Sequence, residues 1–304
     1  MPPLHDSSPQ SAQRRGTIFL EEARVLSQDA CPGGQHVLRL QAPKTAADAA
    51  PGMFVHLQCH ALLPMRRPMS LMRVNPQVGW IEILYKAHGV GTRLLAERAP
   101  GEAVSLLGPI GVPFKLTGYR RRALLIGGGV GIPPMIYLAE HLKSAVPKVS
   151  ALVVMGSEVP FPFQAIPSRI LVPGVPAPVI AAMPLLEDWG IPSRLASRQG
   201  LPGCFDGYVT DLARFWLSSL LAHPLREVEL FACGPTPMLQ AVAELAREYA
   251  LPCQLSVEEY IACGVGGCAG CTVAVRTPSG HAMKRVCVDG PVFEASELVF
   301  RELR

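Results

Sequence analysis

The sequence predicts a multi-domain α/β + β protein with an N-terminal antiparallel β-barrel, a doubly wound parallel α/β domain and a small cysteine-rich domain. Three observations support this fold class. Short alternating apolar runs fill residues 17–118, strand and helix patterns alternate over 119–257, and four cysteines cluster within 258–304. The 304 residues are enough for two or three domains, since a domain typically has about 100–150 residues. The polar residues 1–16 are expected to form a tail.

The barrel is predicted from six short apolar runs, each bounded by glycine, proline or asparagine. Runs of this length and spacing are typical of a small antiparallel barrel or sandwich. A helical pattern at Gly91–Glu97 interrupts them. The expected strands are Ile18–Leu26, Val37–Leu40, Met53–Gln58, Met69–Val74, Trp80–Lys86 and Ala103–Leu107.

The α/β domain is predicted from the alternation of apolar strands with helical patterns after Arg122. Such alternation is typical of a parallel sheet with helices on both faces. The expected strands are Ala123–Ile126, Val149–Met155, Pro192–Ala196, Val228–Ala232 and Cys253–Val257, and the expected helices are Pro134–Lys143, Val209–Leu221 and Pro237–Tyr249. In the last domain, Thr272–Arg276 and His281–Val286 are expected to form a hairpin that turns at Pro278-Ser279-Gly280.

The composition argues against several classes of function. The net charge of +4 is too small for the basic surface that nucleic-acid binding requires. The uncharged stretches 123–139 and 170–186 are interrupted by glycine or proline, so we do not expect them to span a membrane. Because residues 1–16 lack an apolar export signal, a cytoplasmic location is expected. Several of the 30 prolines lie between Pro160 and Pro178 and predict a long irregular loop there.

Four of the nine cysteines have the spacing of metal ligands. Cys263, Cys268 and Cys271 form C-x4-C-x2-C and Cys287 follows later, which is the ligand spacing of plant-type 2Fe-2S ferredoxins. The glycines between them supply the backbone angles that a chain wrapped around a cluster needs. An odd number of cysteines without an export signal also favours redox chemistry in a reducing compartment. Four thiolates would equally satisfy a structural zinc ion, which is the alternative.

Two elements of the predicted barrel suit a bound diphosphate. Arg67-Pro68-Met69-Ser70 begins one strand, and Leu84-Tyr85-Lys86 ends another shortly before the turn Gly91-Thr92 opens a helix. A cation and free helix N–H groups are what a diphosphate needs. These elements resemble the flavin domain of the ferredoxin reductase family, and the resemblance implies that they bind FAD.

Two turns of the predicted α/β domain suit a dinucleotide. Gly127-Gly128-Gly129-Val130-Gly131-Ile132-Pro133 follows a strand and opens a helix, so its glycines let a pyrophosphate approach the backbone. Cys233-Gly234-Pro235 follows a later strand that ends at Ala232. Both turns resemble those of the ferredoxin reductase family, which implies an NAD site with Cys233 close to the nicotinamide.

The order of these motifs resembles one family in particular. Together with the ending R-V-C-x-D-G-P-V-F at Arg285–Phe293, it is similar to the electron-transfer subunits of two-subunit, NAD-linked dihydroorotate dehydrogenases over residues 17–293. The resemblance implies a partner catalytic subunit that carries FMN, in an assembly with two copies of each chain. Electrons would pass from that FMN through the 2Fe-2S cluster and FAD to NAD, in pyrimidine biosynthesis. A flavin is needed because a cluster takes one electron and a nicotinamide takes two.

The sequence leaves three alternatives open. Ser197-Arg198-Gln199-Gly200 lacks acidic residues, which would weaken a preference for NAD or admit NADP. Glu158 after the second α/β strand suits the free ribose hydroxyl of NAD, so we expect NAD. A free-standing reductase that passes electrons from NAD(P)H to a ferredoxin, a hydrogenase or an oxygenase would share every motif except the ending. A metal-stabilised scaffold with a decayed flavin site is the non-enzymatic alternative, and the intact motifs argue against it.

Overall fold

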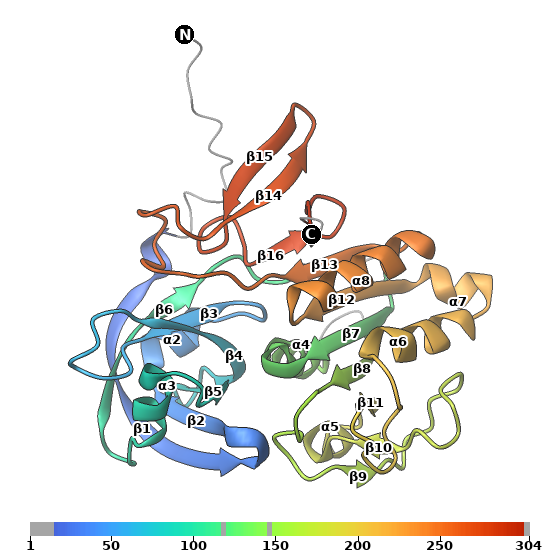
Figure 1. Cartoon of the computed structure of the whole chain (residues 1–304), viewed down its shortest axis with the longest axis horizontal. Coiled ribbons are helices and arrows are strands. Elements are labelled where there is room, and N and C mark those ends of the chain that lie inside the picture. The colour runs from blue at the N-terminus through green and yellow to red at the C-terminus, as the bar shows by residue number, and fades with distance from the viewer. Residues whose placement is uncertain (1–14, 117–119, 145–147, 301–304) are drawn as a thin grey trace.

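The computed structural model describes residues 15–116, 120–144 and 148–300. Its first part is a closed antiparallel barrel with the strand order β1-β2-β5-β4-β3-β6, which confirms the predicted barrel (Figure 1). The short helices α2 (Pro43–Asp48) and α3 (Val90–Ala96) and the 3-10 turns η1 (Arg15–Thr17) and η2 (Pro32–Gly34) accompany the strands. The barrel strands are β1 (Phe19–Cys31), β2 (Gln35–Gln41), β3 (Phe54–Leu57), β4 (Arg67–Asn75), β5 (Trp80–Lys86) and β6 (Ala103–Ile110).

The second part is built on a six-stranded sheet with the order β11-β8-β7-β12-β13-β16. All of its pairings are parallel except the last, so the predicted parallel sheet is confirmed with one antiparallel edge strand added. The sheet strands are β7 (Arg122–Gly128), β8 (Ser150–Gly156), β11 (Ser193–Ala196), β12 (Val228–Cys233), β13 (Cys253–Ser256) and β16 (Val292–Glu294). The helices and the 3-10 turn are η3 (Gly129–Gly131), α4 (Ile132–Leu142), α5 (Pro184–Asp188), α6 (Val209–Ser218), α7 (Ala222–Arg226) and α8 (Thr236–Glu248).

Helices cover both faces of this sheet. Because successive residues of a strand point to opposite sides, each central strand packs against the helices on both faces. Leu124 and Ile126 of β7 belong to the apolar cluster that contains α6 and α8, whereas Leu125 belongs to the cluster that contains α4. A strand buried on both faces is nearly continuous in apolar residues, and β7 reads Ala-Leu-Leu-Ile-Gly-Gly after the half-buried Arg122. None of the helices in the described part of the chain is long and apolar enough to cross a membrane.

The last part of the chain contains the predicted hairpin, formed by β14 (Thr272–Thr277) and β15 (Gly280–Arg285). Each strand is one residue longer at the turn than predicted, and β15 ends one residue earlier. The chain then returns to the α/β sheet, where β16 pairs with β13. The predicted boundary at 258 therefore does not separate two independent sheets. The other boundary, at 118–119, and most of the predicted tail lie outside the described residues.

The proline-rich segment is mainly irregular, as expected, but it contains a small two-stranded sheet. β9 (Ile166–Pro167) pairs with β10 (Ala181–Ala182). The carboxylate of Glu187 accepts hydrogen bonds from the Ser168 hydroxyl and the Arg169 N–H, and Arg194 donates to the Ile170 carbonyl. Buried side chains of the α/β domain thus hold this segment in place.

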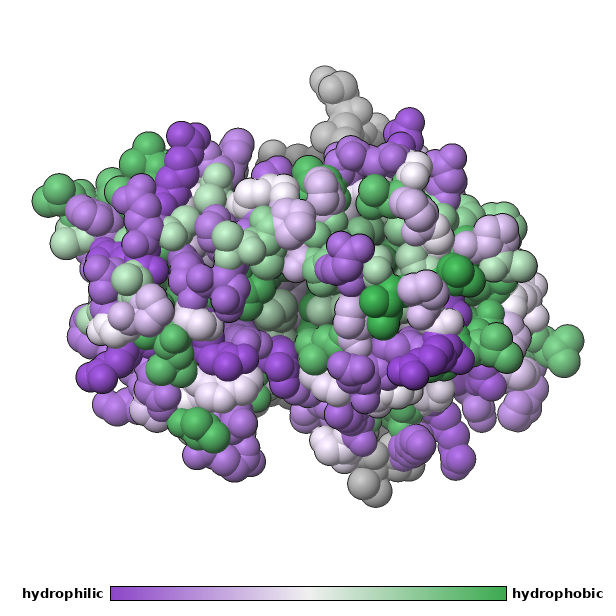
Figure 2. Space-filling view, turned by 90° about the horizontal axis from the view of Figure 1, so that it is seen from below, coloured by the Kyte–Doolittle hydropathy of each residue, from purple (hydrophilic) through white to green (hydrophobic). Residues whose placement is uncertain are grey.

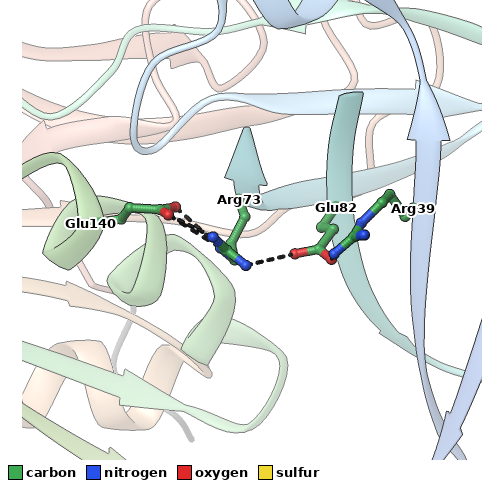
Figure 3. Close-up of polar contacts among 4 residues, drawn as sticks. All are labelled: Arg39, Arg73, Glu82 and Glu140. Carbon is green, nitrogen blue, oxygen red and sulfur yellow. Dashed lines mark hydrogen bonds and ion pairs between the residues drawn. The ribbon is translucent and has the colours of Figure 1, made fainter. Parts of the chain in front are cut away.

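Charged side chains join the barrel to the α/β domain (Figure 3). Arg73 on β4 donates to both carboxylate oxygens of Glu140 on α4, and the shortest of these contacts is 2.8 Å. Glu82 on β5 accepts two hydrogen bonds from Arg39 and lies 3.8 Å from Arg73. The Arg73 guanidinium also lies 5.2 Å from the centre of the Trp189 ring.

In the view from below, hydrophilic and hydrophobic residues are interspersed over the surface of the molecule (Figure 2).

Candidate flavin, nucleotide and cluster sites

A cavity of about 450 Å³, here called the barrel cavity, lies between the barrel and the segment that precedes the cysteine cluster. Strands β4 and β5 are neighbours in the barrel, and their ends bring the two predicted flavin elements together. Of the nine residues expected to bind FAD, all but Gly91 line this cavity. Its lining residues are Phe54, Arg67, Pro68, Met69, Ser70, Leu84, Tyr85, Lys86, His88, Thr92, Val130, Ser256, Val257, Glu258, Glu259, Ile261, Val286 and Pro291.

Gly91, in the first turn of helix α3, does not line this cavity but lies close to Arg67. A Cβ atom at Gly91 would lie 3.6 Å from Arg67 Nε and 3.7 Å from the Cys59 sulfur. The Thr92 hydroxyl accepts hydrogen bonds from the N–H groups of His88 and Gly89, which fixes the start of the helix. The positively charged side chain of Arg67 therefore lies close to the first turn of α3. A cation beside polar groups is what binding of a diphosphate requires.

Tyr85 is a rigid part of the barrel cavity. The residue is 3% exposed, and its ring stacks on His36 with 5.5 Å between the ring centres. Gln28 Nε2 donates a hydrogen bond of 2.7 Å to the Tyr85 hydroxyl. Burial raises the pKa of Tyr85, so the phenol stays protonated. The cavity therefore has a fixed, neutral aromatic wall beside the cations of Arg67 and Lys86.

A second cavity, of about 650 Å³ and here called the sheet-end cavity, lies at the carboxyl ends of the parallel strands. This is where open α/β sheets bind their ligands. Among the residues expected to bind NAD, only Gly128, Gly129, Glu158 and Pro235 line it. The other lining residues are Gln35, Lys86, Val130, Gly156, Ser157, Val159, Ala196, Ser197, Arg198, Gly207, Tyr208, Val209, Thr210, Pro237, Met238 and Ala241.

The remaining residues expected to bind NAD, which are Gly127, Gly131, Pro133, Cys233 and Gly234, lie behind the cavity wall. A Cβ atom at Gly131 would lie 2.3 Å from the carbonyl atoms of Cys233, and one at Gly234 would lie 2.5 Å from Met238. The glycines thus let the two turns pack against each other. Cys233 is 1% exposed and lines neither cavity. Burial, followed by the charge of Glu258, raises the pKa of its thiol.

The sheet-end cavity is lined by charged side chains of both signs, among them Glu158 and Arg198. Gln199 Nε2 donates a hydrogen bond to the backbone carbonyl of Glu158. The Arg198 guanidinium lies 5.1 Å from the centre of the Tyr208 ring and donates a hydrogen bond to its hydroxyl. An acid favours a free ribose hydroxyl and a cation favours a phosphate, so both groups bear on the choice of nucleotide.

The two cavities meet at Lys86 and Val130, which line both of them. Val130 belongs to the glycine-rich turn of the α/β domain, and Lys86 ends barrel strand β5. A ligand in one cavity is therefore next to a ligand in the other. Sequence reasoning did not identify Val130 because it is an unremarkable apolar residue within the glycine motif.

The four predicted metal ligands lie as two pairs. The sulfurs of Cys271 and Cys287 are 3.4 Å apart, and the thiol of Cys268 donates a hydrogen bond to Cys263. Among the described residues, no group of three or more histidine, cysteine or acidic side chains surrounds one point as a single metal ion would require. A 2Fe-2S cluster needs two protein ligands on each of its two irons, so paired thiols fit it.

Backbone geometry around Cys263 also suits anionic sulfur. Gly264 and Gly266 have φ values of +71° and +79°, which turn the chain tightly around Cys263. Burial alone raises the pKa of Cys263, but hydrogen bonds from the N–H groups of Cys268, Val265 and Gly267 and from the Cys268 thiol outweigh it and lower the pKa to about 6. Burial, followed by the neighbouring Cys271 thiol, raises the pKa of Cys287 to about 12. Inward-pointing N–H groups are the donors that clusters use to tune their potential.

The cysteine pairs adjoin the barrel cavity. Ile261, two residues before Cys263, lines that cavity, and so does Val286, the residue before Cys287. The order of the sites is therefore sheet-end cavity, barrel cavity and cysteine cluster. Sequence reasoning did not include Ile261 or Val286 among the site residues, and their position just outside the cysteine motif was the only available signal.

Comparison with known proteins shows the family to which the chain is related. The family model described as the iron-sulfur cluster binding domain of dihydroorotate dehydrogenase B matches residues 258–299. A dihydroorotate dehydrogenase B (NAD(+)), electron transfer subunit from Bacillus caldolyticus is 37% identical over 255 residues, which are 82% of this chain and 86% of that protein. The subunit of the same name from Geobacillus thermodenitrificans (strain NG80-2) is 34% identical over 286 residues, which are 93% of this chain and 99% of the relative.

Solved structures with this fold include flavin-dependent reductases. An NADH-dependent reduced ferredoxin-NADP oxidoreductase superposes with a TM-score of 0.73 at 24% identity, covering 92% of this chain and 90% of the other. The ferredoxin reductase in carbazole 1,9a-dioxygenase has a TM-score of 0.59 at 22% identity, covering 77% and 67%. These structures support the fold, and the relatives support the family. The chain belongs to the electron transfer subunits of NAD-linked dihydroorotate dehydrogenase B.

Proposed function

We propose that this chain carries electrons between a partner dihydroorotate dehydrogenase subunit and NAD. In this proposal the four cysteines hold a 2Fe-2S cluster, the barrel cavity holds FAD, and the sheet-end cavity holds NAD. The partner contains FMN and oxidises dihydroorotate in pyrimidine biosynthesis, and the assembly contains two copies of each chain. Because free thiolate ligands require a reducing compartment, we place the protein in the cytoplasm.

The observation that carries the proposal is the continuous order of the three sites. Lys86 and Val130 line both cavities, and Ile261 and Val286 connect the barrel cavity to the ligand segments. When bound, the flavin supplies the conversion between hydride transfer and single-electron transfer. A site for it between a nucleotide cavity and a thiolate cluster is what that conversion requires.

The chain's own residues bind and orient the cofactors in this proposal. Arg67 and Lys86 supply positive charge for the flavin diphosphate, and the buried ring of Tyr85 fixes one wall of the cavity. Gly128 and Gly129 let the nucleotide approach the start of α4, and Glu158 accepts the ribose hydroxyl. No general base is needed, since the acid–base chemistry on the pyrimidine belongs to the partner.

The test is to prepare the chain without air, alone and together with the partner subunit, and to measure iron, sulfide, flavin and zinc. We expect two irons and one FAD per chain, NADH-dependent dye reduction by the chain alone, and dihydroorotate-dependent NAD reduction only with both chains present. A loaded complex that does not reduce NAD with dihydroorotate would favour the free-standing reductase. A chain that binds zinc and no flavin would favour the scaffold.

A further inference from the structure

His56 lies on the outer surface of the barrel, under the loop that carries the first cysteine ligand. It belongs to β3, where the neighbouring Val55 and Leu57 point into the barrel core. Because alternate strand residues face opposite sides, His56 points outward. The residue is nevertheless 0% exposed. The covering segment is Ile261–Gly264.

Both ring nitrogens of His56 face this covering segment. Nε2 lies 3.1 Å from the Ile261 carbonyl oxygen. A Cβ atom at Gly264 would lie 3.0 Å from Nδ1 and 3.2 Å from Ile110. The ring therefore contacts the segment at its two ends, on either side of Cys263, and a side chain at position 264 would press against the ring.

The hydrogen bond sets the form of the ring. A carbonyl oxygen only accepts, so Nε2 carries the proton and Nδ1 presents a lone pair. Within the described residues, Nδ1 is buried and has no hydrogen-bond partner. Burial, followed by the nearby Arg66 and Arg67, lowers the pKa of His56 to about 4 despite the bond to Ile261, so the ring is neutral at pH 7. A neutral ring adds no charge beside the thiolates.

We propose that His56 is a positioning residue that fixes segment 261–264, and with it Cys263, relative to the flavin in the barrel cavity. This inference rests on the proposed function. Ile261 lines the barrel cavity and Cys263 is two residues away, so one side chain of the barrel controls the segment that joins the two redox sites. A buried polar atom without a partner is costly, and fixing the segment is a role that accounts for a histidine at this position.

The test compares flavin- and cluster-loaded wild type with His56→Leu, which removes both nitrogens, and His56→Gln, which restores a donor near Nε2. Leu57→Ala is the matched control, because Leu57 is equally buried on the same strand but faces the barrel core. Stopped-flow absorbance follows flavin reduction by NADH. Freeze-quench electron paramagnetic resonance follows the arrival of electrons on the cluster and records its g values and reduction potential.

In His56→Leu we expect altered g values and potential, and electron arrival on the cluster slowed about tenfold, because reactions between held groups depend steeply on their placement. Flavin reduction by NADH should stay within about twofold of wild type. His56→Gln should recover most of the difference, and Leu57→Ala should show neither change. Selective loss of the cluster from His56→Leu would also support the inference.

Two results would overturn it. One is a cluster spectrum, potential and rate in His56→Leu that match wild type. The other is the same set of changes in Leu57→Ala, which would assign them to a loosened barrel. If the wild-type chain binds neither flavin nor iron, the proposed function fails together with the inference, whereas a loaded wild type with an unaffected His56→Leu variant removes the inference alone.

Discussion

Arg73 on β4 and Glu140 on α4 form an ion pair between the two parts of the molecule that build the cavities, with 2.8 Å between Nη2 and Oε1. Both side chains are partly buried, at 23% and 26% exposure. The sheet-end cavity draws Gln35 and Lys86 from the barrel and its other lining residues from the α/β domain, so the relative placement of the two parts determines its shape.

Arg73→Ala combined with Glu140→Ala in a double-mutant cycle should give a coupling free energy of about 1 kcal/mol, since the pair is bidentate but partly solvated. Urea denaturation of the four proteins measures it. Arg214 and Glu248 form an exposed ion pair elsewhere, and a cycle on them should give a smaller coupling. Equal couplings would contradict a special role for the Arg73 pair.

Cys287→Ser should abolish iron binding and the visible absorption of the cluster while FAD remains bound, because the ligand is lost and the barrel cavity keeps its cationic side. Iron and flavin analysis of anaerobically purified protein checks this. Cys204→Ser is the control, since Cys204 is partly buried against the apolar core around α4 and not among the cluster cysteines, and this variant should retain iron. Iron retained by Cys287→Ser would exclude Cys287 as a ligand.

Gly131→Ala should lower the free energy of unfolding by about 2 kcal/mol, because the new methyl group would overlap the Cys233 carbonyl and force the two turns apart. Thermal and urea unfolding measure this change. Gly89→Ala is the comparison, because no atom beyond its chain neighbours lies within 4 Å of its Cβ position. It should cost only about 0.5–1 kcal/mol, the loss expected when alanine replaces glycine at an N-cap. A Gly131→Ala protein as stable as wild type would mean that the turns are loosely packed.

Glu158→Gln should raise the ratio of kcat/KM for NADPH to that for NADH by about tenfold, because it removes a charge that repels a 2′-phosphate. Arg198→Ala should shift the same ratio in the opposite direction, since the cation beside Tyr208 is the group that favours a phosphate. Steady-state dye reduction with both nucleotides measures the ratio. A wild type that strongly prefers NADPH would reverse the expected choice of NAD.

The stability of the protein should fall in acid partly because of His56. Its pKa in the folded chain, about 4, is below its ordinary value of 6.5, so the unfolded chain binds more protons between these values. The stabilising contribution is present above pH 6.5 and is lost as the pH falls toward 4, by roughly 3 kcal/mol at most. The free energy of unfolding measured from pH 7 to 4 should decline less steeply in His56→Gln than in wild type. Parallel curves for the two proteins would show that His56 is protonated as easily in the folded chain as in the unfolded chain.

Periodicity predicted the regular elements well, because local patterns determine them. Trp80–Lys86 was predicted with the bounds of β5, and the helix at Gly91–Glu97 is α3, shifted by one residue. The three residues of β16 have no pattern of their own and form a strand only because the edge of β13 is available. Elements defined by such long-range pairing are not visible in a single sequence.

The functional site was predicted only in part, because long-range packing also determines which residues face it. Motifs marked which turns come together, but which of their residues face a cavity depends on packing between the turns. Gly128 lines the sheet-end cavity whereas Gly131 packs on Cys233. His56 was missed because one histidine in an apolar strand has no distinguishing pattern, and its importance comes from a loop more than 200 residues later in the chain.

The pairing of β16 with β13 also limits how this protein could be taken apart or recombined. Residues Val292–Glu294 cover the outer edge of the sheet, and Phe293 packs into the core beneath it. Removing everything after residue 257 would leave the N–H and C=O groups of β13 as an open edge, which invites pairing between molecules and aggregation. The cluster region is therefore not a detachable module, and an engineered chimera would have to exchange it together with the strand that seals the sheet.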